Sequence, residues 1–392
     1  AANRSQSRRT MPAADPAALA KAADTLAGAN RVAIIADFAA RPPRGWNHIV
    51  EIAETLGASV WDVGSRLNFP GDHPLNLTSD FDGCYDGVDV VLTLDIADFE
   101  KPTHVRDIAT RTVVSKVQPN ATWIDIGFTD VETSKWSMDY ARPYYAQQRM
   151  IADPVTAVPQ LTRLLQERIA KTSGLAEKIA RRAEAIGKRH AETRARWAKQ
   201  AQEHWDSKPM TVPRLASEVW KAIKGEDWVL TAGDLGGWGK KLWNFDRPYC
   251  HGGRELGTGT QIGLSLGVAL ANKGTGRLVV DLQPDGDLMF DAGSLWIAAK
   301  YQIPMLVVMF NNRAYYNDWN HQLVLARTRG TDPTRAHIGM DLYGPDPDFA
   351  GLARSMGWYA EGPVENGDDM QAALKRAIEQ VKKGKPALVD SI

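Results

Sequence analysis

The sequence contains two series of short apolar runs, which are separated by longer segments with helical spacing. The first series covers residues 31–36, 59–62, 88–94, 111–115 and 122–126, and the second covers residues 228–231, 277–281, 304–310 and 386–390. Runs of this length that are rich in Val, Ile and Leu are typical of strands buried on both faces. Their alternation with helices predicts an α/β fold with two doubly wound parallel-sheet domains.

A highly charged segment lies between the two series. Residues 171–203 are dense in Ala, Glu, Lys and Arg and contain no proline, which predicts a long, solvated linking helix. The chain of 392 residues is also longer than one hydrophobic core usually organises. We therefore predict a first domain over residues 1–165, a linker helix over residues 166–208 and a second domain over residues 209–392.

The composition excludes several classes of protein. Lys and Arg together number 47, as do Asp and Glu, so the net charge is zero and we expect no nucleic-acid partner. Cys84 and Cys250 lack the spacing of a zinc site or a disulfide framework, which favours a reducing compartment. No apolar run approaches the length of a membrane span, so we expect a cytoplasmic protein without a membrane partner. The basic opening, residues 1–10, indicates a flexible arm or an organelle-targeting fragment.

Polar residues follow two strands of the second series. A strand that contains Asp281 leads to Asp285 and Gly286, and after a helix through Lys300 a second strand ends at Asn312. This order places both polar clusters at the carboxyl edge of a parallel sheet, where open α/β sheets bind ligands. A carboxylate and an amide oxygen, completed by a backbone carbonyl and diphosphate oxygens, suit Mg²⁺. Gly286 and the following helix N-terminus suit a phosphate group.

This arrangement resembles the Gly-Asp-Gly to Asn-Asn signature of thiamine diphosphate enzymes, in the branch that contains acetolactate synthase, benzoylformate decarboxylase and 2-hydroxyacyl-CoA lyase. The resemblance implies that Asp285, Asn312 and the backbone carbonyl of Ala314 bind Mg²⁺. It also implies that Gly286, Asp287 and Asn312 contact the cofactor, thiamine diphosphate. The sequence departs from the signature at Pro284, where the family has its first glycine. That position shapes the turn rather than the metal site.

Two glycine-rich loops extend the resemblance. The loop over residues 233–238 is similar to the first diphosphate-contacting loop of the family, to which Gly236 and Gly237 contribute backbone N–H groups. The alternative is that the glycines in such loops only permit tight helix packing.

The second loop, residues 252–260, opens a helix that runs to Ala271, as the second cofactor loop of the family does. In the family, a bulky residue in this loop holds the cofactor in its bent form. Thr258 matches that place by its distance from the downstream glycines, with Leu256 as the rival and Gly257 between them.

Candidate catalytic groups follow the second asparagine. In related decarboxylases the residue six places beyond it acts on the substrate carboxylate, and here that residue is Asp318. Tyr315, Tyr316, His321 and His251 are further candidates near the reactive carbon of the cofactor. The alternative is that the aromatic residues pack in the interior and that each histidine has an ordinary structural role.

The first domain resembles the central domain of the family. Some relatives hold a nucleotide there, but residues 37–44 lack the glycine fingerprint, so we expect no flavin or nicotinamide. Arg41 and Arg44 are interpreted as solvated loop residues, with contact to an anionic substrate as the alternative.

Family members normally begin with another α/β domain, whose glutamate activates the pyrimidine of the cofactor. This sequence begins with the central domain, which predicts a large subunit that needs a second polypeptide carrying the pyrimidine-binding domain and the glutamate. The expected assembly is a hetero-oligomer with a dimeric core. The alternative is that the sequence is a fragment.

The function implied by the resemblance is cleavage or formation of a C–C bond in a 2-oxo acid, an acyloin or a 2-hydroxyacyl-CoA. Such an enzyme is a decarboxylase, a lyase or a carboligase, and its substrate is a small molecule. One alternative is a non-catalytic cofactor-binding or regulatory subunit. Another is an oxidoreductase that binds a nucleotide in the first domain.

Overall fold

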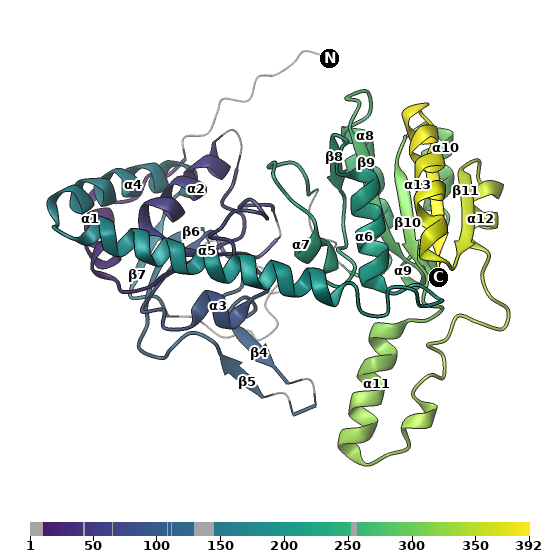
Figure 1. The fold of residues 1–392 in the computed structure, drawn as a ribbon, viewed down its shortest axis with the longest axis horizontal. Coiled ribbons are helices and arrows are strands. Elements are labelled where there is room, and N and C mark those ends of the chain that lie inside the picture. Colours follow the sequence, from purple (N-terminus) through teal and green to yellow (C-terminus); the bar gives the residue numbers. More distant parts are fainter. Residues whose placement is uncertain are drawn as a thin grey trace. The chain divides into compact units, whose positions relative to one another are not determined.

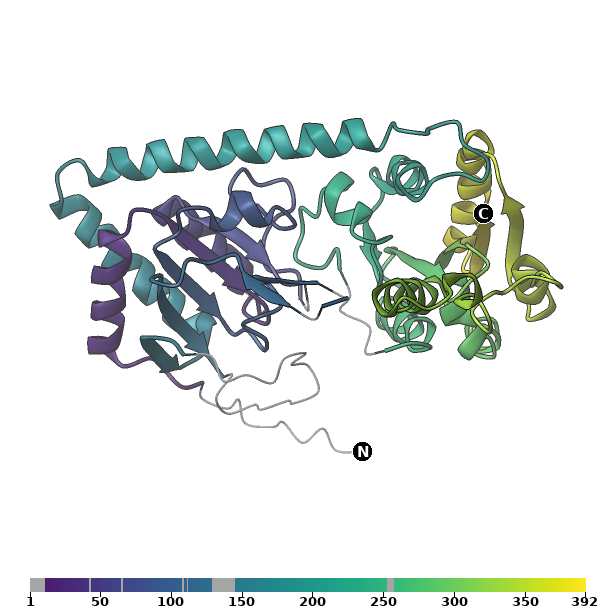
Figure 2. The same cartoon turned by 90° about the horizontal axis from the view of Figure 1, so that it is seen from below.

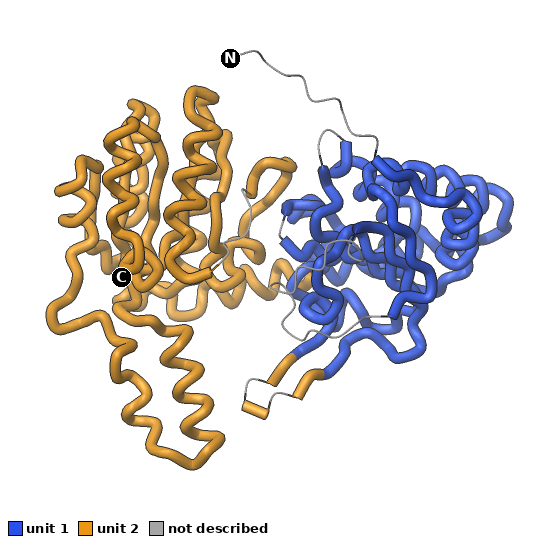
Figure 3. Tube along the Cα trace, turned by 180° about the vertical axis from the view of Figure 1, so that it is seen from behind, with its two compact units in different colours: residues 1–105, 114–191 blue, residues 106–113, 192–392 orange. Residues whose placement is uncertain are grey.

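A computed structural model describes residues 11–41, 44–64, 66–107, 109–110, 112–128, 145–251 and 257–392. The chain divides into two compact units (Figure 3). The first unit contains residues 1–105 and 114–191, and the second contains residues 106–113 and 192–392. The division falls inside helix α5 (Leu175–Gln200), whereas we predicted the whole segment 166–208 as a separate linker.

The first unit is built on a five-stranded parallel sheet (Figure 1). Its strand order is β2 (Ser59–Asp62), β1 (Val32–Ala36), β3 (Val90–Leu94), β6 (Thr122–Gly127) and β7 (Gln148–Ile151). Every residue of β1 and β3 is buried, as expected for strands covered on both faces. Helix α4 (Pro154–Lys171) packs with both α1 (Pro16–Gly28) and α2 (Gly45–Leu56), and α3 (Phe81–Tyr85) contacts β2.

One predicted strand does not belong to this sheet. Residues 111–115 were expected there, but β5 (Val113–Ser115) pairs with β4 (His104–Arg106) in a separate two-stranded sheet. The prediction was wrong because it took this short apolar run for a buried strand, whereas Val114 is 56% exposed. The edge position is taken by β7, whose polar sequence gave no signal because an edge strand has only one neighbour.

The charged segment forms α5, as predicted, and two of its arginines also bind groups of the first unit. Arg182 donates hydrogen bonds to the carbonyls of Leu56 and Gly57 at the end of α2, with a distance of 3.1 Å to Gly57. Arg189 pairs with Asp80, with an Nε–Oδ2 distance of 2.6 Å. These arginines satisfy backbone carbonyls and a buried carboxylate of the first unit.

The second unit contains another five-stranded parallel sheet (Figures 1 and 2). Its order is β11 (Tyr359–Val364), β12 (Ala387–Ser391), β10 (Leu306–Phe310), β9 (Leu278–Pro284) and β8 (Trp228–Leu230). Helices α8 (Gln261–Ala271), α10 (Ser294–Lys300) and α12 (Phe349–Ser355) share one apolar core with this sheet. Helices α6 (Val212–Ile223) and α13 (Gly367–Lys382) pack together. Both sheets confirm the predicted fold class.

Three further helical segments follow strands of the second sheet. These are α7 (Trp238–Leu242), α9 (Asp285–Phe290) and α11 (Tyr316–Arg329), and a 3₁₀ turn, η1 (Pro333–Arg335), comes after α11. The helix predicted to run from the Asp285 turn to Lys300 is therefore two helices, α9 and α10. Helix α11 buries none of its residues and projects away from the sheet (Figure 1).

None of the helices in the described part of the chain is both long enough and apolar enough to cross a bilayer.

Candidate functional site

The side chains of Asp285 and Asn312 meet at the carboxyl edge of the second sheet. Strands β9 and β10 are parallel neighbours, and their last residues, Pro284 and Phe310, lie opposite each other in the register. The backbone N–H of Ala314 donates to Oδ2 of Asp285 at 3.2 Å and lies 3.0 Å from Oδ1 of Asn312. The two predicted ligands therefore come together although they lie far apart in the sequence.

Asp285 is a buried carboxylate without a cationic side chain beside it. It is 1% exposed, and within the described ranges no side-chain nitrogen of Lys, Arg or His lies within 4 Å of its oxygens. Burial raises the pKa of the Asp285 carboxyl, while backbone N–H groups, including those of Gly286 and Ala314, oppose this rise. A desolvated carboxylate beside an amide oxygen fits a divalent cation, which would supply the missing positive charge. The described residues contain no cluster of three or more His, Cys, Asp or Glu, so amide and carbonyl oxygens would complete the set.

Pro284, which departs from the family signature, fits the local geometry. It is the last residue of β9 and the N-cap of α9, with φ −69° and ψ 143°. Proline readily adopts this φ value.

Gly286 lies directly against the ring of Tyr315. A Cβ atom at this position would lie 2.7 Å from Cδ1 of Tyr315, so only glycine allows the ring to lie there. The Tyr315 ring also lies 5.4 Å from that of Phe290, measured between centroids. Tyr315 is thus the predicted catalytic residue that the fold brings to the Asp285 turn.

The first glycine-rich loop shares a cavity with Asn312. Leu235, Gly236 and Gly237 all have positive φ values, of 56°, 62° and 89°. Leu235 and Gly236 line a cavity of about 480 Å³ together with Asn312 and other residues that follow β10. Gly237 begins α7, and its N–H donates to Asp234 at 2.8 Å. Loops that follow β8 and β10 therefore line the same cavity.

The second glycine-rich loop is tied to α9. Leu256 lies outside the described residues, while Gly257 and Thr258 form a turn before α8. The N–H of Gly259 donates to the carboxylate of Asp287, which also accepts a hydrogen bond from Gln283 Nε2 at 3.0 Å. Asp287, predicted to contact the cofactor, thus holds this loop against α9.

Sequence reasoning missed two buried polar residues of this edge. Gln261 donates from Nε2 to the Asp281 carboxylate at 2.7 Å and to the Leu282 carbonyl at 2.6 Å, which links α8 to β9. Asp390 accepts a hydrogen bond from Asn311 at 3.2 Å, and burial raises its pKa to about 6. Asp390 stands near the carboxyl end of an apolar run, which is the same signal that pointed to Asp285.

The remaining predicted catalytic residues occupy two different environments. Burial, helped by the charge of Lys240, lowers the pKa of His251 to about 4 against the opposing effect of Asp234, so the ring is neutral near pH 7. Its ring centroid lies 6.3 Å from that of Phe245. In contrast, Tyr316, Asp318 and His321 lie exposed on α11.

Comparison with known families identifies the second unit. Residues 231–391 match the family described as thiamine pyrophosphate enzyme, C-terminal TPP binding domain. This part of the chain is similar to the C-terminal domain of thiamine pyrophosphate enzymes. Thiamine pyrophosphate is the same compound as thiamine diphosphate, so the match agrees with the predicted family and cofactor. The matched range contains both glycine-rich loops, the Asp285 turn and Asn312.

Solved structures of thiamine diphosphate enzymes share the fold of the whole chain. Benzoylformate decarboxylase from Polynucleobacter necessarius is similar with a TM-score of 0.70 and 16% identity, covering 99% of this chain. The thiamine diphosphate-dependent 4-hydroxybenzoylformate decarboxylase from Rhodococcus jostii RHA1 gives 0.69 and 17%, covering 100% of this chain. The chain spans 66% of the length of each. At these identities the likeness shows the shared fold.

Proposed function

We propose that this chain binds thiamine diphosphate with Mg²⁺ and takes part in cleavage or formation of a C–C bond. The reaction that we favour is the decarboxylation of a 2-oxo acid. The observation that carries the proposal is the meeting of Asp285 and Asn312 at Ala314, in a domain similar to the C-terminal domain of thiamine pyrophosphate enzymes. The structures named above are decarboxylases of aromatic 2-oxo acids, which supports this substrate class. The lyase and carboligase reactions use the same cofactor site.

Each residue of the site has a proposed task. Asp285, Asn312 and the Ala314 carbonyl hold Mg²⁺, which neutralises the diphosphate. The N–H of Gly236 faces the same anion, whereas the N–H of Gly237, which we predicted to contact it as well, donates to Asp234. When bound, the cofactor supplies a nucleophilic carbon that adds to the substrate carbonyl.

Two of the candidate catalytic residues have environments that fit specific roles. His251 is partly buried and neutral near pH 7, so it acts as a hydrogen-bonding group rather than as a cation. The ring of Tyr315 lies against the Asp285 turn and helps to exclude water from it.

We further propose that a second polypeptide covers an apolar face next to this site. Helix α8 contacts both α9 and α10, and these helices with the C-cap of α10 expose Leu270, Phe290, Trp296 and Tyr301, each between 54% and 62%. Gly263 and Gly267 on α8 have open space where a Cβ would be, which allows close approach of another backbone. An exposed apolar surface of this kind is typical of protein interfaces. The proposed partner carries the pyrimidine-binding domain and the activating glutamate.

Calorimetric titration of thiamine diphosphate tests the metal-dependent binding. The chain should bind the cofactor with Mg²⁺ and lose the affinity in EDTA. Asn312→Ala should weaken binding at least tenfold because a metal ligand is lost, while Asn47→Ala, on an exposed residue of the first unit, should bind as the unaltered chain does. Equal binding with and without metal would refute the magnesium site.

Activity measurements test the partner. Carbon dioxide release from benzoylformate should require co-expression of the chain with a polypeptide that carries a pyrimidine-binding domain, for which the product of the neighbouring reading frame is the first candidate. Trp296→Glu should abolish this activation and preserve cofactor binding. Ile151→Glu, at an exposed apolar residue of the first unit, is the matched control. Full turnover by the chain alone would contradict the requirement for a partner.

A further inference from the structure

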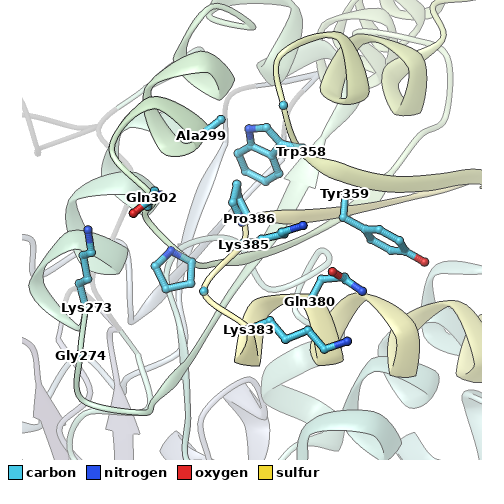
Figure 4. A pocket seen from close by; sticks show the side chains of 13 residues that line it. Lys273, Gly274, Ala299, Gln302, Trp358, Tyr359, Gln380, Lys383, Lys385 and Pro386 are labelled. Atoms are coloured by element: carbon cyan, nitrogen blue, oxygen red, sulfur yellow. The ribbon is translucent and has the colours of Figure 1, made fainter.

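A second cavity lies at the opposite edge of the C-terminal sheet from the cofactor site (Figure 4). Its volume is about 740 Å³, which is within the range of ligand pockets in proteins. Its walls include Pro304 and Pro386, which precede β10 and β12, together with residues at the ends of α8, α10 and α13. It therefore lies where the strands begin, whereas Asp285 and Asn312 lie where the strands end.

Three lysines line this cavity without an acidic residue among its lining residues. They are Lys273, Lys383 and Lys385, and Figure 4 shows Lys273 on one side and the other two across the cavity. Lys273 donates to the carbonyl of Tyr301 at 2.8 Å. Over the part of the chain that the structure describes, no carboxylate oxygen lies within 4 Å of any of the three ammonium groups. The cavity thus gathers positive charge that the protein does not pair.

The helix ends at this edge do not cancel that charge. Residues at or just beyond the C-termini of α8, α10, α12 and α13 line the cavity. A helix C-terminus is equivalent to roughly half a negative charge, so these four ends contribute about −2. The three lysines contribute three positive charges, and the cavity remains net positive.

The other lining groups suit a polar ligand. Gln302 and Gln380 supply carboxamides from two sides of the cavity, and both can donate hydrogen bonds. Trp358 is held in the wall by a 2.6 Å hydrogen bond from its indole N–H to the Leu295 carbonyl. Tyr359 lies beside it and is partly exposed. Ammonium and amide donors without a nearby carboxylate are the recognition chemistry of a phosphorylated ligand.

We infer that this cavity binds the diphosphate group of a small molecule. Two or three ammonium groups match the charge of a diphosphate, and the volume accommodates either pyrophosphate or a nucleoside diphosphate. This inference does not depend on the proposed function, because the cavity shares no residue with the cofactor site.

Calorimetric titration of pyrophosphate and of ADP, without divalent metal, tests the site. Both titrations use the Asp285→Ala background, so that the cofactor site does not contribute. We expect saturable binding of at least one probe. If pyrophosphate binds as tightly as ADP, the cavity recognises the diphosphate alone. If ADP binds more tightly, the cavity also contacts the nucleoside.

Two double variants decide whether the lysines are responsible. Lys383→Gln with Lys385→Gln should weaken binding at least tenfold. Lys224→Gln with Lys375→Gln removes the same charge from exposed lysines outside the cavity and should leave the affinity within twofold. Circular dichroism checks that each variant is folded. Absence of saturable binding at millimolar probe, or equal weakening by both double variants, would overturn the inference.

Discussion

The two parallel sheets end in similar residues that are used in opposite ways. At the carboxyl edge of the first sheet, Asp95 and Asp153 both pair with Arg41, with a distance of 2.8 Å to Asp153. At the same edge of the second sheet, Asp285 is contacted by backbone N–H groups and has no cationic side chain beside it in the described structure. The first edge satisfies its own charges, while the second leaves a buried carboxylate for an external cation.

This difference shows that the architecture alone does not create a site. Both sheets are five-stranded, parallel and covered by helices, and both bring acidic residues to the same edge. A buried charge is costly unless it is paired, so the pairing decides which edge can bind a ligand. Arg41, which we predicted to be a solvated loop residue, instead pairs with both of these carboxylates at the first edge. Arg44 is exposed, as predicted.

The largest effect should come from removing one carboxylate at each edge. Asp285→Ala should lower the affinity for thiamine diphosphate with Mg²⁺ by at least about 100-fold, because the bound metal loses its anionic ligand. Asp95→Ala should leave the affinity within twofold and reduce stability instead, since Arg41 loses one of its two partners. Calorimetry gives the affinities and urea denaturation gives the stabilities. Normal cofactor binding by Asp285→Ala would contradict the claim that the second edge, unlike the first, provides a carboxylate for a metal ion.

The partly buried histidine of the second unit, His251, should make stability depend on pH. The folded pKa of His251 is about 4, below its ordinary value of 6.5, so the unfolded chain takes up a proton first as the pH falls. The free energy of unfolding should therefore decrease between pH 6.5 and pH 4, with about 3 kcal/mol due to this residue.

His251→Gln should remove that part of the decrease, whereas His48→Gln in the first unit should retain it. Urea denaturation at pH 7 and pH 4 measures the difference. The same pH dependence in His251→Gln and in the unaltered chain would show that the ring is not kept neutral by burial.

Two glycines should differ because their neighbours differ in freedom. In the first unit, a Cβ on Gly127 would lie 2.7 Å from Cα of Asp95, and the backbone cannot easily move. In the second unit, a Cβ on Gly286 would meet the Tyr315 ring, which can rotate away. We expect Gly127→Ala to cost about 2 kcal/mol or more and Gly286→Ala about 1 kcal/mol. Denaturation of both variants tests this order, and a larger loss in Gly286→Ala would reverse it.

The smallest effects should be the same in both units. Asp15 caps α1 by accepting from Ala18 N–H at 2.9 Å, and Asp348 caps α12 by accepting from Gly351 N–H at 2.6 Å. Each substitution to Ala should cost about 1 kcal/mol, because a cap acts locally. Thermal denaturation measures both losses. A clear difference between the two stability losses would mean that the contribution of a helix cap depends on the unit in which it lies.

Local signals were sufficient where they reported burial or a helix end. The apolar runs at β1, β3, β9 and β10 were recognised because strands covered on both faces need continuous apolar residues. Asp15 followed by Pro16 marked a helix start, which the cap of α1 confirms. Edge strands β7 and β11 were not predicted, because fewer of their residues are buried and their sequences lack a continuous apolar run.

The sequence by itself determined that two parallel sheets form and that Asp285 and Asn312 follow neighbouring strands. Strand order and chain direction are enough for this, because parallel strands end at one edge. Only the tertiary structure decided that β5 pairs with β4 outside the main sheet and that Arg41 pairs with the acidic residues at the carboxyl edge of the first sheet. It also decided that Gln261 and Asp390 form buried hydrogen bonds near the carboxyl edge of the second sheet. These outcomes depend on pairing between residues distant in sequence, whose energies are set by burial and by the groups that meet after folding.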